Sequence, residues 1–189
     1  MVSMGPRVKG LTIRNCLAAT EQLRGREACE QAVLRLEPEI ADAVRYGGLV
    51  AGAWYPLAWQ NAVLAALAAE THGGLPFLRQ VGRVAVKLGL NSAHRVFVRV
   101  LGAHRSLAVS ARFFNQHYER GTCEFLERRD GYARALWSGC DGFDANIWAT
   151  VAGAAEGILE SVEAENIRLH VVSGGGDRDG AMEAEARWN

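Results

Sequence analysis

The sequence predicts an α+β fold in which a helical N-terminal two-thirds packs on a C-terminal four-stranded antiparallel sheet, built as hairpin, helix, hairpin. Two observations predict it. Up to about residue 120, apolar residues recur every three to four positions, a period typical of amphipathic helices. After Gly121 the period changes to two, which is typical of strands with one buried face. The 189 residues fit one domain, residues 1–189, with a helical part at about 10–120 and a strand-rich part at about 121–188.

Start and stop signals divide the first part into helices. Proline suits the first turn of a helix, glycine commonly ends one, and Asn or Ser can cap one. The expected helices are residues 26–36, a short helix from Pro38 to near Gly47, one after Trp54-Tyr55-Pro56 that ends at Gly73-Gly74, one opened by Pro76, a short one capped by Asn91 or Ser92, and a longer one from about Ser106 to Gly121.

The first expected hairpin joins residues 122–129 to residues 132–138 through Asp130-Gly131. This dipeptide is a strong two-residue turn signal, because a type I′ turn needs positive φ at both central positions. The turn sets Glu127 opposite Arg134 and Phe125 opposite Leu136.

A helix from about Phe143 to Glu163 separates this hairpin from the second one. Alternating residues 167–171 and 182–188 form its strands, joined by a flexible glycine-rich loop at 173–180 that lacks the pattern of a phosphate or calcium loop. The expected pairs are Val171 with Met182, His170 with Glu183, and Arg168 with Glu185.

Charge is distributed unevenly although the net charge is zero. The window from Thr71 to Tyr118 holds no Asp or Glu, while all 21 acids lie outside it. Fixed cations there can meet nucleic-acid phosphates, an anionic membrane surface, a small anionic ligand or an acidic protein, or can pair with acids on neighbouring elements. The window holds four of the five histidines and seven basic residues: Arg79, Arg83, Lys87, Arg95, Arg99, Arg105 and Arg112.

Several classes of function are disfavoured. The zero net charge, with no helix-turn-helix, zinc spacing or glycine-aromatic strand motif, disfavours nucleic-acid binding. His94, His104 and His117 lack metal-ligand spacing, so no metal site is expected. Neither Ser106 nor Ser110 lies in a strand-turn-helix nucleophile elbow, and no catalytic constellation is evident.

Residues 46–69 form an uncharged run of 24 residues, which is long enough to cross a bilayer. Pro56, Gln60 and Asn61 interrupt the run, so we expect a buried helix with no membrane insertion. No signal peptide is apparent near the start, which favours a cytoplasmic location. The scattered cysteines are expected to be buried, reduced thiols: Cys16, Cys29, Cys123 and Cys140.

Four short segments carry a resemblance that spans most of the chain. They are Val8-Lys9-Gly10, Trp54-Tyr55-Pro56, Phe77-Leu78-Arg79-Gln80-Val81-Gly82-Arg83 and Glu185-Ala186-Arg187-Trp188. With this layout the chain resembles a paralogous family of uncharacterised proteins abundant in myxobacteria. That family is similar to the group of haem nitric-oxide-binding, 4-vinyl reductase and Bet3-type domains. The resemblance implies helices beside a C-terminal antiparallel sheet, an enclosed apolar ligand or lipid, and a sensor-like role.

The resemblance implies no cofactor for this chain. The haem-binding members carry a Tyr-x-Ser-x-Arg motif downstream of a histidine, whereas here His104 is followed by Arg105-Ser106-Leu107-Ala108-Val109. The cysteine cluster of some 4-vinyl reductase domains is also missing, since residues 179–183 read Asp-Gly-Ala-Met-Glu.

The function expected from these observations is a non-enzymatic sensor or regulatory domain that holds a small organic ligand between its helices and sheet. Its apolar wall is expected to come from Trp54, Trp59, Phe97, Phe113 and Trp137, with an anionic group on the ligand meeting Arg83, Lys87, Arg95 or Arg99. The alternative is a protein-interaction or self-assembly module. It would dock on an acidic partner, or on a second copy as a homo-oligomer, through an exposed stripe of Arg79, Arg83 and Lys87.

Overall fold

The computed structural model describes residues 5–90, 111 and 114–189. The expected helix at Asn91 or Ser92 lies outside the described residues, as does the first part of the helix expected from Ser106. Arg95, Phe97, Arg99 and Phe113 of the expected ligand site also lie outside them.

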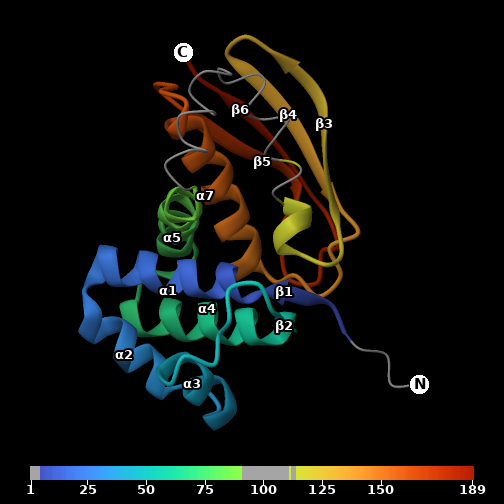
Figure 1. Cartoon of the computed structure of the whole chain (residues 1–189). Helices are drawn as coiled ribbons and strands as arrows, with labels where there is room; N and C mark the ends of the chain where they lie inside the picture. Colours follow the sequence, from blue (N-terminus) through green and yellow to red (C-terminus); the bar gives the residue numbers. More distant parts are fainter. Residues whose placement is uncertain (1–4, 91–110, 112–113) are drawn as a thin grey trace.

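The predicted fold class is confirmed: helices occupy one side of the molecule and a four-stranded antiparallel sheet the other (Figure 1). The helices are α1 (Gly10–Arg24), α2 (Arg26–Leu34), α3 (Pro38–Arg45), α4 (Leu57–Thr71), α5 (Gly74–Gly89) and α7 (Ala145–Ser161). The strands are β1 (Arg7–Lys9), β2 (Trp54–Pro56), β3 (Thr122–Arg129), β4 (Tyr132–Ser138), β5 (Arg168–Gly174) and β6 (Met182–Arg187). Within the sheet the strand order is β3-β4-β6-β5, so the two hairpins meet along β4 and β6.

The first hairpin turns at Asp130-Gly131 as expected, but its register differs beyond the turn. Of the two turn residues Gly131 has positive φ and Asp130 does not, so the expected type I′ geometry was wrong. Glu127 lies opposite Arg134, as predicted. Phe125 lies opposite Ala135 instead of Leu136, so that prediction was wrong. A bulge between Phe125 and Glu127 places one extra residue, Leu126, on β3 and shifts every pair that follows.

The second hairpin is shifted by two residues from the expected register. All three predicted pairs were wrong, because the observed pairs are Val171 with Ala184, His170 with Glu185, and Arg168 with Arg187. The cause is the length of β5, which continues to Gly174 and pairs this residue with Met182. The turn begins only there, because Gly174 and Gly175 supply the positive φ angles.

The glycine-rich loop after β5 is tied to the start of α7. The Asp177 carboxylate accepts a hydrogen bond from the Ala145 N–H at 3.0 Å, and the Trp148 indole donates to the Asp179 carbonyl at 3.1 Å. Asp144 caps the same helix by accepting from the Ile147 N–H at 2.8 Å. The loop that was expected to be flexible therefore helps to fix α7 over the sheet.

The small β1–β2 sheet and the limits of α1 were not predicted. Val8 of β1 pairs with Tyr55 of β2 and is fully buried. Gly10 begins α1 where the chain passes the Val50 carbonyl, and a Cβ at this position would collide with that oxygen. The two short strands thus bring the start of α1 against the entry to α4.

The core lies between the sheet and the helices, with α7 packed closely on α5 and α5 on α1 (Figure 1). Its largest fully buried side chains include Trp148, Phe77 and Ile13. An aromatic row crosses the core from Tyr118 through Phe143 to Trp148, with ring centroids 4.8 Å apart at each step. Among the described helices, none has the length and apolar character needed to cross a bilayer.

Candidate functional site

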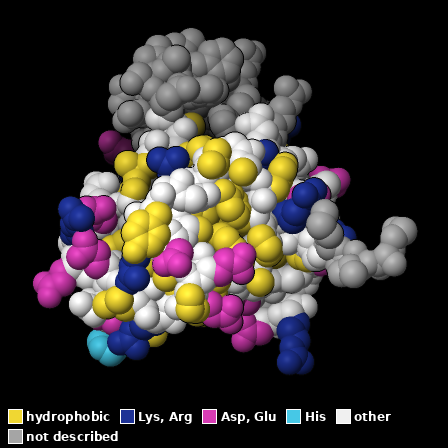
Figure 2. Space-filling view, turned by 60° about the horizontal axis from the view of Figure 1, so that its bottom comes forward, with side chains coloured by type: hydrophobic (Ala, Val, Ile, Leu, Met, Phe, Trp, Pro, Cys, Tyr) yellow, Lys and Arg dark blue, Asp and Glu magenta, His cyan; other side chains and the backbone are white. Residues whose placement is uncertain are grey.

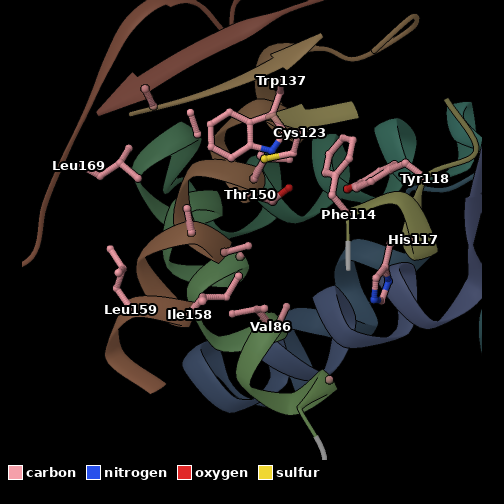
Figure 3. Close-up of a pocket in the computed structure, with 18 of the residues that line it drawn as sticks. Val86, Phe114, His117, Tyr118, Cys123, Trp137, Thr150, Ile158, Leu159 and Leu169 are labelled. Carbon is pink, nitrogen blue, oxygen red and sulfur yellow. The ribbon is translucent and has the colours of Figure 1, made fainter. Parts of the chain in front are cut away.

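A cavity of about 180 Å³ lies between the sheet and the helices α1, α5 and α7 (Figure 3). Trp137 and Cys123 come from the sheet side, while Val86 of α5 and Ile158 of α7 come from the helical side. Phe114 and Tyr118 lie side by side at one end. Most of the described lining is therefore hydrocarbon or aromatic ring.

The cavity exists because small residues occupy its walls. On the sheet, the inward positions of β4 and β6 are alanines in register, Ala133 opposite Ala186 and Ala135 opposite Ala184. On α7, Ala154 and Ala155 face the same space. Protein interiors are normally filled to the density of organic crystals, so methyl groups on both walls leave room that larger side chains would occupy.

Glycines bring α5 and α7 together behind the cavity. A Cβ on Gly82 would collide with the Thr150 carbonyl, and one on Gly153 would collide with the Arg79 carbonyl. The two backbones touch where a side chain would otherwise separate them. This contact fixes the position of α7, and with it one wall of the cavity.

One end of the cavity carries neutral polar groups. The Gln60 side-chain amide donates from Nε2 to the Tyr118 hydroxyl at 3.1 Å. The Gln60 Oε1 atom is buried and has no hydrogen-bond partner within the described part of the chain. Nearby, Thr12 Oγ1 and His117 Nδ1 are 2.8 Å apart and share a hydrogen bond. All four side chains line the cavity.

Burial favours the uncharged forms of two thiols, the Tyr118 hydroxyl and the His117 imidazole in the lining. It raises the pKa values of the Cys16 and Cys123 thiols to about 12 and raises that of the Tyr118 hydroxyl as well. Burial also lowers the pKa of His117, and Lys9 adds to this effect. The thiols are therefore protonated at neutral pH and do not serve as nucleophiles.

Glu185 is the charged residue of the described lining, but its side chain points to the opposite face of the sheet from the inward-facing Ala184 and Ala186. Its carboxylate accepts a hydrogen bond from the Tyr132 hydroxyl at 3.3 Å and lies 3.6 Å from the Arg187 guanidinium. No cluster of three or more His, Cys, Asp or Glu residues in the described ranges is placed to hold a metal ion.

Among the described residues of the expected ligand site, Trp137 lines the cavity. Trp54 lies on β2, where the Lys9 ammonium is 4.0 Å from its ring centroid. Trp59 packs against Tyr55, with ring centroids 5.3 Å apart. These two tryptophans pack where the small sheet meets α4 and are not part of the cavity wall.

The stripe Arg79, Arg83, Lys87 runs along α5 against carboxylates of α7. Arg79 forms a bidentate pair with Glu156 through bonds of 2.7 and 3.1 Å and also donates to the Leu169 carbonyl at 2.8 Å. Arg83 and Lys87 both pair with Glu160. Internal pairing, the alternative to a docking surface, thus engages all three cations. The three side chains nevertheless keep 34% to 48% of their area exposed. Docking of a partner on the stripe therefore stays a prediction.

The helical end of the molecule does not present a face of one charge. Lys and Arg side chains alternate there with Asp and Glu side chains around a band of apolar ones (Figure 2).

Sequence reasoning missed Gln60 and Tyr118 as cavity residues. Gln60 carried a signal in the sequence, because it is an amide within the apolar run that forms α4. In the structure its side chain is 1% exposed. The alternation of alanines in β4 and β6 was a second signal, since two such strands in register place only small side chains on one face of the sheet.

No protein-family model matches the sequence, and no curated protein matches it. Solved structures of H-NOX proteins share its fold. The Fe(II) unliganded H-NOX protein from K. algicida aligns with a TM-score of 0.65 at 15% sequence identity, with 96% of each chain covered. A point mutant of the H-NOX protein from T. tengcongensis gives a TM-score of 0.60 at 12% identity, covering 96% of this chain and 97% of that one.

A third similar structure is described as an oxygen-binding H-NOX domain related to soluble guanylate cyclases. It aligns with a TM-score of 0.56 at 13% identity and covers 96% of this chain and 95% of that chain. These likenesses establish the fold, and at that level they agree with the expected relation to the haem nitric-oxide-binding group. The resemblance to the myxobacterial family stays a prediction.

Proposed function

We propose that this protein is a non-enzymatic ligand-binding sensor domain, and that its cavity holds a small, uncharged, mainly apolar organic molecule. The observation that carries the proposal is the cavity of about 180 Å³ between the sheet and α5 and α7. Its walls are alanines and aromatic rings, so the space arises from residue choice along several elements.

The size of the cavity sets the size of the ligand. Apolar cavities of about 150 Å³ in proteins stay dry and bind benzene or xenon. A molecule with one aromatic ring therefore fits. Burying about 150 Å² of its apolar surface contributes about 4 kcal/mol, which corresponds to a dissociation constant of roughly 1 mM.

The charge of the described lining favours a neutral ligand over the anionic one expected from the sequence. Arg83 and Lys87 pair with Glu160 and are not part of the cavity wall. The described lining has no Lys or Arg, and the Glu185 carboxylate lies on the opposite face of the sheet, where it contacts Tyr132 and Arg187. An anion would lose its hydration in this lining without a cation to compensate.

The described lining does not fit a haem, the group bound by the haem nitric-oxide-binding domains that the chain resembles. A haem carries two propionate carboxylates, and the described residues around the cavity offer them no cation. A porphyrin is also several times larger than the ring that a cavity of about 180 Å³ accepts. The proposed function therefore contains no step at a haem iron.

The sensor role is supported by the shared fold and by the position of the cavity. One H-NOX neighbour is described as oxygen-binding and related to soluble guanylate cyclases, and another structure was studied for H-NOX activation. In this chain, α7 forms a cavity wall and is also packed backbone to backbone on α5. We propose that occupancy of the cavity is transmitted through this contact.

Calorimetric titration of the full chain with toluene tests the binding. We expect one site with a dissociation constant of roughly 1 mM. The variant Ala155→Phe, which places a ring in the cavity from a partly exposed position, should not bind, whereas Ala28→Phe on the remote helix α2 should bind as the wild type does. If the wild type releases no saturable heat, or if Ala155→Phe binds equally well, the cavity is not the ligand site.

A further inference from the structure

The polar end of the cavity holds an acceptor that the described protein leaves unused. Gln60 is 1% exposed, and its Oε1 atom has no hydrogen-bond partner in the described ranges. Buried polar atoms in folded proteins nearly always have a partner, so each exception requires an explanation. Here the amide lines a cavity, and a bound molecule can supply the missing donor.

The Tyr118 hydroxyl next to Gln60 indicates which chemical group of a ligand would serve as that donor. Tyr118 accepts the Gln60 Nε2 hydrogen bond with its oxygen at 3.1 Å, so its own proton is not used in this bond. The pair thus combines an acceptor, Gln60 Oε1, with a donor, the Tyr118 O–H. A ligand hydroxyl complements both groups, because it donates one hydrogen bond and accepts another.

Most of the remaining described lining is apolar. Trp137 and the facing alanines of β4 and β6 contact the remainder of any bound molecule. Thr150 adds no free donor to this wall, because its hydroxyl donates to the Ile147 carbonyl at 2.7 Å. The buried acceptor without a described partner in this lining is Gln60 Oε1, which directs the polar contact of a ligand to Gln60.

From this arrangement we infer that the ligand is a small aromatic alcohol of the phenol class, with its hydroxyl bound between Gln60 and Tyr118 and its ring against Trp137. The inference rests on the proposed function, since it specifies the ligand of the same cavity. It distinguishes phenols from hydrocarbons of equal shape and from carboxylates.

Phenol and toluene provide the test, because they differ only in a hydroxyl or methyl group on one ring. Toluene leaves water more readily, so a purely apolar cavity binds toluene more tightly. We expect the wild-type chain to bind phenol about tenfold more tightly than toluene, as one or two buried hydrogen bonds would produce. In Gln60→Met, which keeps the side-chain length, toluene should bind more tightly than phenol. Thr20→Val, which removes a buried hydroxyl outside the lining, should keep the wild-type preference.

A second measurement uses only the wild type, in case Gln60→Met does not fold. Phenol should shift the carbon resonance of the Gln60 side-chain carbonyl through the new hydrogen bond, and toluene should leave it within the range of ring-current changes.

The outcomes separate the two proposals. If neither compound binds, the proposed function itself is wrong. If toluene binds and phenol binds no more tightly, the cavity is a ligand site and the hydroxyl inference is wrong. Retention of the phenol preference in Gln60→Met would also overturn the inference.

Discussion

At the residue scale, the molecule depends on positions where a single atom decides the packing. Gly153 on α7 is one of them, because any Cβ there would collide with the Arg79 carbonyl of α5. Gln60 is another, because its buried amide has one partner among the described residues and an acceptor oxygen that none of them contacts. Neither position could be recognised by residue type alone, since glycine and glutamine are common in helices for other reasons.

Gly153→Ala should lower the free energy of unfolding by about 1–3 kcal/mol, the usual result of forcing extra volume into a packed contact. Urea denaturation measures the difference. Gly52→Ala is the control, because a Cβ there meets nothing within 4 Å, and its effect should stay within about 0.5 kcal/mol. Equal stability of Gly153→Ala and the wild type would show that α5 and α7 do not touch at this position.

His117 should make stability depend on pH. Burial lowers its pKa in the folded chain, so the unfolded chain binds the proton more readily. The stabilisation is fully present above the unfolded pKa of about 6.5 and is lost as the pH falls through the lowered folded value. The unfolding free energy of the wild type should therefore fall more steeply below about pH 6.5 than that of His117→Asn. Parallel curves for the two proteins would contradict this assignment.

At the element scale, α7 links the sheet, the cavity and the remaining helices. Its first turn is capped by Asp144 and by Asp177 of the β5–β6 loop, and its glycines allow the backbone of α5 to pack directly against it. On the solvent side, Glu156 and Glu160 pair with the cations of α5. The three described cations of the acid-free window on α5 are thus paired with carboxylates of the adjacent helix.

Glu160→Gln should destabilise the protein by about 1 kcal/mol at low salt, because Arg83 and Lys87 share this carboxylate and would then repel each other unopposed. The effect should shrink at about 1 M salt, where screening acts over a few ångströms. Glu30→Gln removes an exposed pair with Arg26 on α2 and is the control, with an expected change of less than about 0.5 kcal/mol. Identical losses in both variants would mean that the α5–α7 pairs add nothing specific.

At the scale of the whole molecule, the change of hydrophobic period at Gly121 was enough to predict the fold class. The Asp130-Gly131 turn fixed the register only as far as Glu127, because the bulge at Leu126 leaves no mark in the turn itself. One residue of the cavity lining was predictable as well: Trp137 is an apolar, inward-facing strand residue. The pairing of Gln60 with Tyr118 was not predictable, because these residues lie 58 residues apart and meet only through tertiary packing.

The central claim is that the cavity between α5, α7 and the sheet binds a small neutral molecule. Anomalous diffraction from crystals of the full chain soaked with 4-bromophenol tests it directly. We predict a bromine peak inside the cavity beside Trp137, and a hydroxyl oxygen within about 3.2 Å of Gln60 Oε1. Well-diffracting soaked crystals with no bromine peak in the cavity would contradict the account.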